Sequence, residues 1–420
     1  MLFRYLFKGG RNILNTLYEV RKLSSKNIVS PKGFAAAGMH CGIKHKKKDL
    51  ALLVSEVPAS VAGVFTTNAI QAAPLKVTKE VVYRTGKMQA LIVNSGNANA
   101  CTGKQGIADA YEMQSLAALK LGIDPSLIGV ASTGVIGEMM KMEPIRAGVG
   151  KLELGKTLEH GIDFAQAILT TDTVMKNTTY STLIDGKEVV ISGSAKGSGM
   201  IEPNMATMLG FITTDANIES EVLQAALSEI TDLTFNAITV DGDTSTNDTV
   251  IVMANGLAEN ETLTPEHPDW HNFYSTLQVV AEDLAKAIAR DGEGATKLIE
   301  VEVVGAFSDE EGRKIAKTVV GSPLVKTAVF GNDANWGRII AAVGYSGASV
   351  DPEKITIKIG NALMVENGEP VPFSEEELIK ILKANEVKIS VSLGLGEGQG
   401  LAWGCDLTYD YVQINASYRS

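Results

Sequence analysis

The most informative stretch of this 420-residue chain is the segment 196–211, KGSGMIEPNMATMLGF, which lies near the midpoint. Glycines and a proline lead up to the small residue Ala206, and Thr207 follows it. This layout is typical of a chain that cuts itself before a threonine. The cut frees an α-amine on the residue that carries the hydroxyl, and such an amine can activate the hydroxyl as a nucleophile. The alternative is a glycine-rich loop that enters a buried strand at 208–213, and spacing alone favours that alternative.

A second candidate for chemistry is the pair Thr133-Gly134, within a strand-to-loop transition at 130–136. Acyl transfer passes through a tetrahedral oxyanion, which needs two hydrogen-bond donors directed at one point. A threonine hydroxyl and a backbone N–H on a glycine loop supply them, and loss of one such donor costs about 3 kcal/mol in the barrier. Without further context, Ser-Thr-Gly is an ordinary turn.

Two other segments resemble ligand-binding loops. The segment 394–400, GLGEGQG, follows a strand, but 408–414 alternates like another strand, and a phosphate loop needs a helix N-terminus behind it. We therefore predict a tight turn or bulge there. The segment 241–248, DGDTSTND, carries three carboxylates whose spacing does not match a calcium loop. We interpret it as a polar turn near an active site.

Composition and charge exclude several classes of protein. With 45% hydrophobic and 21% charged residues, the chain is typical of a soluble globular protein, and its length suggests two or three lobes. The net charge is −11, and the one dense basic run, 44–48, reads as a solvated turn, so no nucleic-acid partner is expected. The three cysteines are too few and too scattered for a disulfide framework. His267 and His271 are interpreted as surface residues, and no metal is predicted.

The N-terminal segment 1–27 differs from the rest of the chain. It carries six basic residues and a single acid, Glu19, and its apolar residues recur at helical spacing. A basic, amphipathic, acid-poor leader predicts a mitochondrial transit peptide and a location in the mitochondrial matrix. The sequence contains no run of about 20 apolar residues, so no membrane span is expected.

Helices and alternating strands intermix along the remainder of the chain. Because several strands alternate between apolar and polar residues, we predict a layered α+β fold rather than a doubly wound parallel sheet. Helices are expected at 107–121, ended by Gly122, near 280–288, and after Ser374, whose capping box includes Glu377. Strands are expected at 87–93, which runs into a polar turn at 94–99, and at 130–136, 249–253, 299–303, 355–359 and 387–393.

Many ordered blocks of this sequence resemble the bifunctional ornithine acetyltransferases, the ArgJ-type family, over about residues 31–420. The blocks are GMHCGIK (38–44), NSGNAN (94–99), STGVIG (132–137), TTDT (170–173), 196–209, 241–248, DGEGATK (291–297), KTA (326–328), GNDANWGR (331–338) and 411–420. The resemblance implies a sandwich of sheets flanked by helices, similar to the N-terminal-nucleophile hydrolases.

The resemblance also implies an activity. The precursor would cut itself between Ala206 and Thr207 into an α chain, 28–206, and a β chain, 207–420. Thr207 would then take an acetyl group from N²-acetylornithine, release ornithine, and pass the acetyl group to glutamate by a ping-pong mechanism. The product, N-acetylglutamate, belongs to the cyclic pathway of arginine synthesis. The resemblance also suggests an assembly of two α and two β chains, and the sequence leaves the assembly state open.

The family's site residues map onto this sequence. Thr133 and Gly134 match the oxyanion hole. The substrate contacts match Thr170, Lys196, Thr207, Glu293, Asn415 and Ser420, with the choice between Thr170, Thr171 and Thr173 left open. Lys196 suits the substrate α-carboxylate, and Glu293 suits the ornithine ammonium.

Three questions stay open on the sequence alone. Some family members also accept acetyl-CoA as a donor, and no other cofactor is expected. An amidohydrolase or aminopeptidase that uses the same Thr207, with water as the acceptor, is an alternative function. A non-catalytic protein with an uncut loop at 205–207 is another.

Overall fold

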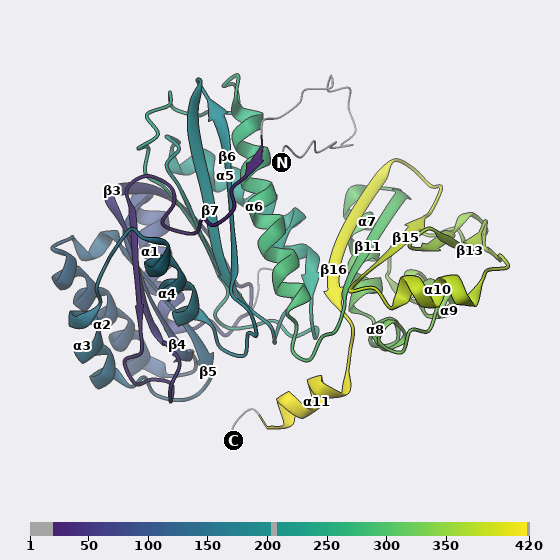
Figure 1. Ribbon diagram of the computed structural model, residues 1–420, viewed down its shortest axis with the longest axis horizontal. Coiled ribbons are helices and arrows are strands. Elements are labelled where there is room, and N and C mark those ends of the chain that lie inside the picture. The colour runs from purple at the N-terminus through teal and green to yellow at the C-terminus, as the bar shows by residue number, and fades with distance from the viewer. Residues whose placement is uncertain (1–19, 203–207, 418–420) are drawn as a thin grey trace. The chain divides into compact units, whose positions relative to one another are not determined.

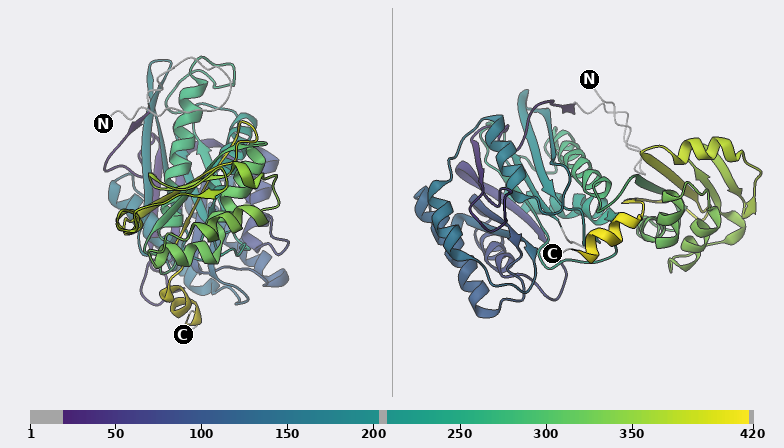
Figure 2. Two further views of the ribbon diagram at one scale, coloured as in Figure 1. Left: turned by 90° about the vertical axis from the view of Figure 1, so that its right-hand side faces the viewer. Right: turned by 60° about the horizontal axis from the view of Figure 1, so that its bottom comes forward.

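The computed structural model describes residues 20–202 and 208–417, so the predicted cleavage residues Ala206 and Thr207 and the predicted substrate residue Ser420 lie outside the described residues. The described chain forms two compact units, each with its own sheet and core (Figures 1 and 2). Unit 1 contains residues 20–197, 208–232 and 244–284, and unit 2 contains 198–202, 233–243 and 285–417. Each unit therefore combines chain from both sides of the predicted cut.

The strands of unit 1 form a mixed sheet in the order β1-β6-β7-β8-β10-β3-β4-β5, with β2 paired to β3. The pairs β4–β5 and β8–β10 are parallel, and the others are antiparallel. The strands are β1 (Arg21–Lys22), β2 (Phe34–Met39), β3 (Leu50–Phe65), β4 (Lys87–Asn97), β5 (Ile128–Val135), β6 (Lys176–Ile184), β7 (Lys187–Lys196), β8 (Leu209–Thr214) and β10 (Thr249–Ala254).

Helices cover both faces of this sheet (Figure 1). They are α1 (Ala73–Thr85), α2 (Gly103–Leu121), α3 (Met142–Lys151), α4 (Leu158–Ile168), α5 (Ser220–Leu233) and α6 (Trp270–Arg290), with a short 3₁₀ turn at Pro125–Leu127. Side chains alternate along β3, so that Leu50 and Leu52 pack with α2 and α3, whereas Ala51 and Leu53 pack with α4. The two cores fix the strand register, because a slip of one residue would exchange the two faces.

Unit 2 contains a second mixed sheet, in the order β14-β13-β12-β15-β11-β16-β9. Its strands are β9 (Ile238–Thr239), β11 (Leu298–Ala306), β12 (Thr356–Ile359), β13 (Ala362–Glu366), β14 (Glu369–Pro370), β15 (Glu386–Ser392) and β16 (Gly398–Cys405). Its helices are α7 (Asp309–Gly321), α8 (Pro323–Phe330), α9 (Trp336–Tyr345), α10 (Glu375–Leu382) and α11 (Tyr409–Ala416), with 3₁₀ turns at Phe235–Ala237 and Pro352–Lys354. A core of aliphatic side chains from β11, β12, β15 and α7 to α10 joins sheet and helices.

The predicted layered α+β fold is confirmed, and so are several local signals. Helix α2 ends at Gly122, which adopts a left-handed φ of 67° and whose N–H bonds to the carbonyl of Ala118. Helix α10 begins after Ser374, whose hydroxyl accepts the N–H of Glu377. No helix within residues 20–202 or 208–417 is long and apolar enough to cross a bilayer.

Three local predictions are wrong. Strand β4 continues to Asn97, through the predicted polar turn, because its pairing with β5 extends to that residue. The predicted strand at 408–414 is helix α11, which buries no side chain and whose backbone groups bond within the helix. The basic run 44–48 is not fully solvated, because Lys44 is half-buried and donates to the carbonyl of Leu169.

Candidate active site

The predicted oxyanion residues lie at the end of β5, where it runs parallel to β4. Ser95 is opposite Thr133, and Gly96 is opposite Gly134. Gly134 has a φ of +134°, and a Cβ there would lie 2.3 Å from the carbonyl carbon of Gly96. Only glycine fits this position. The strand pairing therefore fixes the backbone of the Thr133-Gly134 step before any substrate binds.

Lys196, the predicted carboxylate-binding residue, ends strand β7 and meets the oxyanion residues. Its ammonium donates to the hydroxyl of Thr133 over 3.4 Å and lies 3.9 Å from a carboxylate oxygen of Asp172. The Lys196 side chain is only 5% exposed. A buried cation beside a hydroxyl donor is suited to hold an anionic group or to stabilise developing negative charge.

Asp172 is the centre of this arrangement. One carboxylate oxygen accepts from the ammonium of Lys176 at 2.7 Å and from the backbone N–H of Gly197 at 2.6 Å, and the other accepts the N–H of Thr170 at 2.9 Å. Burial alone would raise the pKa of Asp172, but Lys196 and Lys176 outweigh it and hold that pKa below its ordinary value. The carboxylate therefore stays charged and ties β7 to the Thr170 loop.

Sequence reasoning missed the roles of Asp172 and Lys176. Their spacing of four residues is the available signal, and on a sequence it reads as an exposed i,i+4 pair. Both side chains are in fact fully buried. Thr170 is placed in this network by its backbone N–H, and this contact does not decide between the hydroxyls of the neighbouring threonines as the substrate contact.

A buried carboxyl lies beside the first described residue after the predicted cut. The N–H of Thr249 donates to the carbonyl of Met208, which aligns β10 with β8, and Asp248 precedes that strand. Among the described residues, neither carboxyl oxygen of Asp248 has a hydrogen-bond partner. Burial raises the pKa of Asp248 well above its ordinary value, although the charge of the Lys196 ammonium opposes that rise.

The rest of the 241–248 segment is a turn, as predicted. Within unit 1, the amide of Asn247 donates to the carbonyls of Ala98 and Ser132, at 2.6 and 2.8 Å. These bonds attach the segment to the ends of β4 and β5. The turn therefore supports the oxyanion strand rather than a cation.

Unit 2 brings together two other predicted substrate residues, Glu293 and Asn415. The Asn415 amide donates to the Glu293 carboxylate at 2.8 Å, and the Glu293 N–H donates to the carbonyl of Ser198. A Cβ on Gly199 would lie 2.4 Å from the Glu293 carboxyl carbon, so glycine is required for this close approach. Glu293 is 7% exposed and is not merely a solvated residue at the end of a helix.

Asp241 binds the backbone of Met200 and Ile201, which follow Gly199. Its carboxylate accepts the N–H groups of Met200 and Ile201, at 2.6 and 2.8 Å, and the hydroxyl of Tyr411 at 3.3 Å. In unit 1, Asp172 binds the backbone of Gly197, and in unit 2, Asp241 binds the backbone of Met200 and Ile201. These carboxylates fix the described residues that lead to the predicted cut.

A protein-family model described as the ArgJ family matches residues 35–420. The chain belongs to the ArgJ family. The arginine biosynthesis bifunctional protein ArgJ of Halalkalibacterium halodurans is 60% identical over 410 residues, which cover 97% of this chain and all of that relative. A crystal structure of the same-named protein from Bacillus halodurans is 67% identical, with a TM-score of 0.50, and covers 50% of this chain and all of that chain. The ornithine acetyltransferase of Mycobacterium tuberculosis, solved in complex with ornithine, is 38% identical over 44% of this chain and 98% of that one, with a TM-score of 0.41.

The mitochondrial location predicted from residues 1–27 is wrong. The similar ArgJ proteins come from bacteria, and the alignment with the H. halodurans relative covers 97% of this chain, so it reaches into that segment. The described part of the segment also belongs to the fold, since β1 pairs with β6 and Lys22 forms a 2.7 Å ion pair with Asp283. The positive charge of Lys22 is therefore paired within unit 1.

The glycine-rich segment 394–400 follows β15 and runs into β16. The turn after β15 enters strand β16 directly, so the 394–400 segment has no helix behind it, as predicted. Gly400 packs against Gly312 of α7, where a Cβ would lie 2.0 Å from the Gly312 carbonyl carbon. Gly400 therefore allows strand β16 to approach helix α7 closely.

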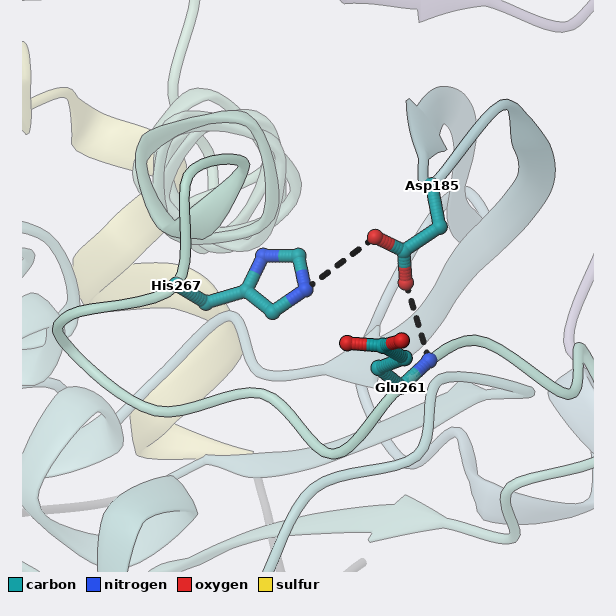
Figure 3. A group of neighbouring side chains, drawn as sticks. All are labelled: Asp185, Glu261 and His267. Atoms are coloured by element: carbon teal, nitrogen blue, oxygen red, sulfur yellow. Dashed lines mark hydrogen bonds and ion pairs between the residues drawn. The ribbon is translucent and has the colours of Figure 1, made fainter.

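One group of side chains in unit 1 has the composition of a metal site: Asp185, Glu261 and His267 (Figure 3). The backbone N–H of Asp269 donates to Nδ1 of His267, so the ring proton belongs on Nε2, which faces Asp185 at 3.2 Å. A metal-binding histidine instead donates its second ring N–H to a neighbour. The group therefore acts as a hydrogen-bonded link between the β6–β7 turn and the loop before α6. The His267 side chain is 7% exposed and is not the surface residue that the sequence suggested.

Proposed function

We propose that this chain is a self-processing acetyltransferase of arginine biosynthesis, which moves an acetyl group from N²-acetylornithine to glutamate through an acetyl-Thr207 intermediate. Membership of the ArgJ family and 60% identity to bifunctional ArgJ relatives support this function. The observation that carries it is the set of buried contacts between Thr133, Lys196 and Asp172 at the strand that leads to the predicted cut.

The proposed chemistry needs three parts, and the described residues supply two. The hydroxyl of Thr133 and the backbone at Gly134 form the oxyanion hole, and Lys196 holds the α-carboxylate. The third part is Thr207, whose hydroxyl attacks the acetyl carbonyl while its own α-amine takes the proton. The carbon–nitrogen bond to ornithine then breaks, and the leaving nitrogen takes up that proton. Glutamate's amine attacks the acetyl ester in the second half-reaction and restores the hydroxyl.

In unit 2, Glu293 is assigned to the side-chain ammonium of N²-acetylornithine, with Asn415 and Ser420 as further substrate contacts. The charge and burial of Glu293 support this assignment, because a buried carboxylate favours a cation.

Self-cleavage between Ala206 and Thr207 would give an α chain ending at 206 and a β chain of 207–420. The B. halodurans crystal structure supports this division, because half of this chain matches that chain over its whole length. We propose that two α and two β chains assemble. The word bifunctional in the relatives' names supports a second donor, for which we propose acetyl-CoA.

The test compares the wild-type protein with Thr207→Ala on a denaturing gel, followed by sequencing of the fragments. We expect two wild-type fragments, one of which begins Thr207-Met208-Leu209, and one intact chain in the variant. Incubation with N²-acetylornithine and glutamate should give N-acetylglutamate with parallel initial-rate lines. Release of acetate without N-acetylglutamate would identify a hydrolase instead, and an uncut wild-type chain would refute the proposed nucleophile.

A further inference from the structure

The two substrates of the proposed reaction have side chains of opposite charge. In a ping-pong mechanism, N²-acetylornithine and glutamate occupy the acyl-transfer site in turn. The first has a side chain that ends in an ammonium group, and the second has one that ends in a carboxylate. Glu293 is assigned to the ammonium, whereas a side-chain carboxylate is favoured by a cation. Lys196 is assigned to the α-carboxylate that both substrates share, so a second cation would favour glutamate.

Lys44 is a cation close to the Thr170 loop and to the oxyanion strand. Its ammonium donates to the carbonyl of Leu169 at 2.8 Å, and Leu169 is bonded to Thr170, whose N–H is held by Asp172. The Lys44 side chain also lies close to the oxyanion strand. A Cβ on Gly96 would lie 2.8 Å from Cγ of Lys44, and Gly96 pairs with Gly134. The Lys44 side chain is thus placed between the Thr170 loop and the oxyanion residues.

The position of the Lys44 backbone is set independently of any substrate. Asp49 is fully buried and accepts four consecutive backbone N–H groups, those of residues 41–44, at 2.6 to 3.2 Å. The carboxylate of Asp49 is therefore occupied by its own loop. Among the described residues, the hydrogen-bond acceptor of the Lys44 ammonium is a neutral carbonyl rather than a carboxylate.

Electrostatics shows that this cation is in an unfavourable environment. Burial, together with the neighbouring cations Lys47 and Lys196, lowers the pKa of Lys44 to about 8, against the opposing effects of Asp49 and Asp172. A carboxylate that arrived beside the ammonium would relieve both the desolvation and the repulsion from Lys196. The environment of Lys44 therefore favours an anionic ligand beside its ammonium.

We infer that Lys44 is a specificity-determining residue that binds the side-chain carboxylate of the acceptor glutamate. This inference rests on the proposed function. It deepens that function by adding a contact for the acceptor side chain at Lys44 to the shared α-carboxylate contact proposed at Lys196, both within unit 1.

The experiment measures both half-reactions in Lys44→Met, which keeps the length of the side chain and removes its charge. We expect the KM for glutamate to rise about 10- to 100-fold, the range for a lost hydrogen bond to a charged group. The KM for N²-acetylornithine should change less than about twofold, since its ammonium makes no bond to Lys44. Lys44→Arg should recover most of the glutamate affinity, because it restores the charge.

Glutamine, which has a neutral amide in place of the side-chain carboxylate, provides a sharper comparison. The wild-type protein should prefer glutamate over glutamine as the acceptor, and Lys44→Met should lose most of that preference. The exposed neighbour Lys46 gives the matched control, since Lys46→Met removes a charge from the same loop at a solvated position. It should retain wild-type kinetics for both acceptors.

The outcomes separate this inference from the proposed function. Self-cleavage into two fragments reports that the Lys44→Met variant has folded. If the wild-type protein makes no N-acetylglutamate, the proposed function fails. If the wild type transfers acetyl normally but Lys44→Met raises both KM values equally, lowers only kcat, or leaves the acceptor preference unchanged, then Lys44 does not read the glutamate side chain.

Discussion

Asp172→Asn is the substitution whose consequence the structure specifies best. The change keeps the shape of the side chain and removes its charge, while Lys176 and Lys196 remain beside it. Removal of one partner of a buried ion pair costs about 3–5 kcal/mol, because the other charge is left without compensation. Both Asp172 and Lys176 are fully buried in their side chains, so solvent provides no relief. We therefore expect unit 1 to lose about 3–5 kcal/mol of unfolding free energy.

Lys176→Met should cost less than Asp172→Asn. In that variant the Asp172 carboxylate still accepts the N–H groups of Thr170 and Gly197 and still has Lys196 at 3.9 Å. The double variant should lose less than the sum of the two single losses, because the paired charges are removed together.

The pH dependence follows from the sign of the Asp172 shift. Its pKa in the folded chain lies below the ordinary value, so its stabilising contribution is fully present above about pH 4, the pKa in the unfolded chain. The contribution is lost only as the pH falls through the lower, folded pKa. The difference between wild type and Asp172→Asn should therefore be constant from pH 8 to pH 5 and shrink in more acidic solution.

Hydrogen-exchange mass spectrometry against urea concentration measures these effects, in a Thr207→Ala background that keeps the chain in one piece. Peptides from β6 and β7 report on unit 1, and peptides from β11 and β15 report on unit 2 as an internal control. A loss in unit 1 below about 1 kcal/mol, or a larger loss for Lys176→Met than for Asp172→Asn, would refute the buried-pair reasoning.

Two further predictions concern the proposed catalytic groups. Thr133→Val, which removes the hydroxyl but keeps the β-branched shape, should lower kcat about 100- to 1000-fold with little change in either KM; an unchanged kcat in steady-state assays would exclude that hydroxyl from the oxyanion hole. Glu293→Gln should raise the KM for N²-acetylornithine about 10- to 100-fold and leave that for glutamate unchanged or lower, opposite to Lys44→Met; equal effects on both substrates would contradict its assignment to the ornithine ammonium.

Local signals in the sequence predicted much of the fold because they depend on neighbouring residues. Gly122 and Ser374 mark helix ends through backbone geometry and a single hydrogen bond, which a short segment contains in full. The alternation at 299–303 and 387–393 likewise predicts β11 and β15. The same reasoning failed at 408–414, where alternation is present but the segment forms helix α11 and pairs with no strand of the described residues.

The segment 1–27 shows how composition can mislead. A basic, acid-poor stretch predicts a targeting leader, yet at Lys22 the positive charge is satisfied by Asp283, which lies 261 residues away. The partner of a charged side chain is not visible in its own neighbourhood of the sequence. The bacterial ArgJ relatives, rather than the charge pattern, decided the question of location.

The sequence by itself determined the family, the candidate nucleophile and the positions of most helices and strands, because each of these is written in ordered blocks or local periodicity. Tertiary structure alone decided which charges are buried together. Lys44 reads as part of a solvated run and Asp248 as one of three carboxylates in a turn, and the sequence does not indicate that Asp172 and Lys176 are buried together. Their burial and partners come from strands and loops far apart in the chain, and burial is what turns an ordinary charge into one that stabilises the fold or favours a ligand.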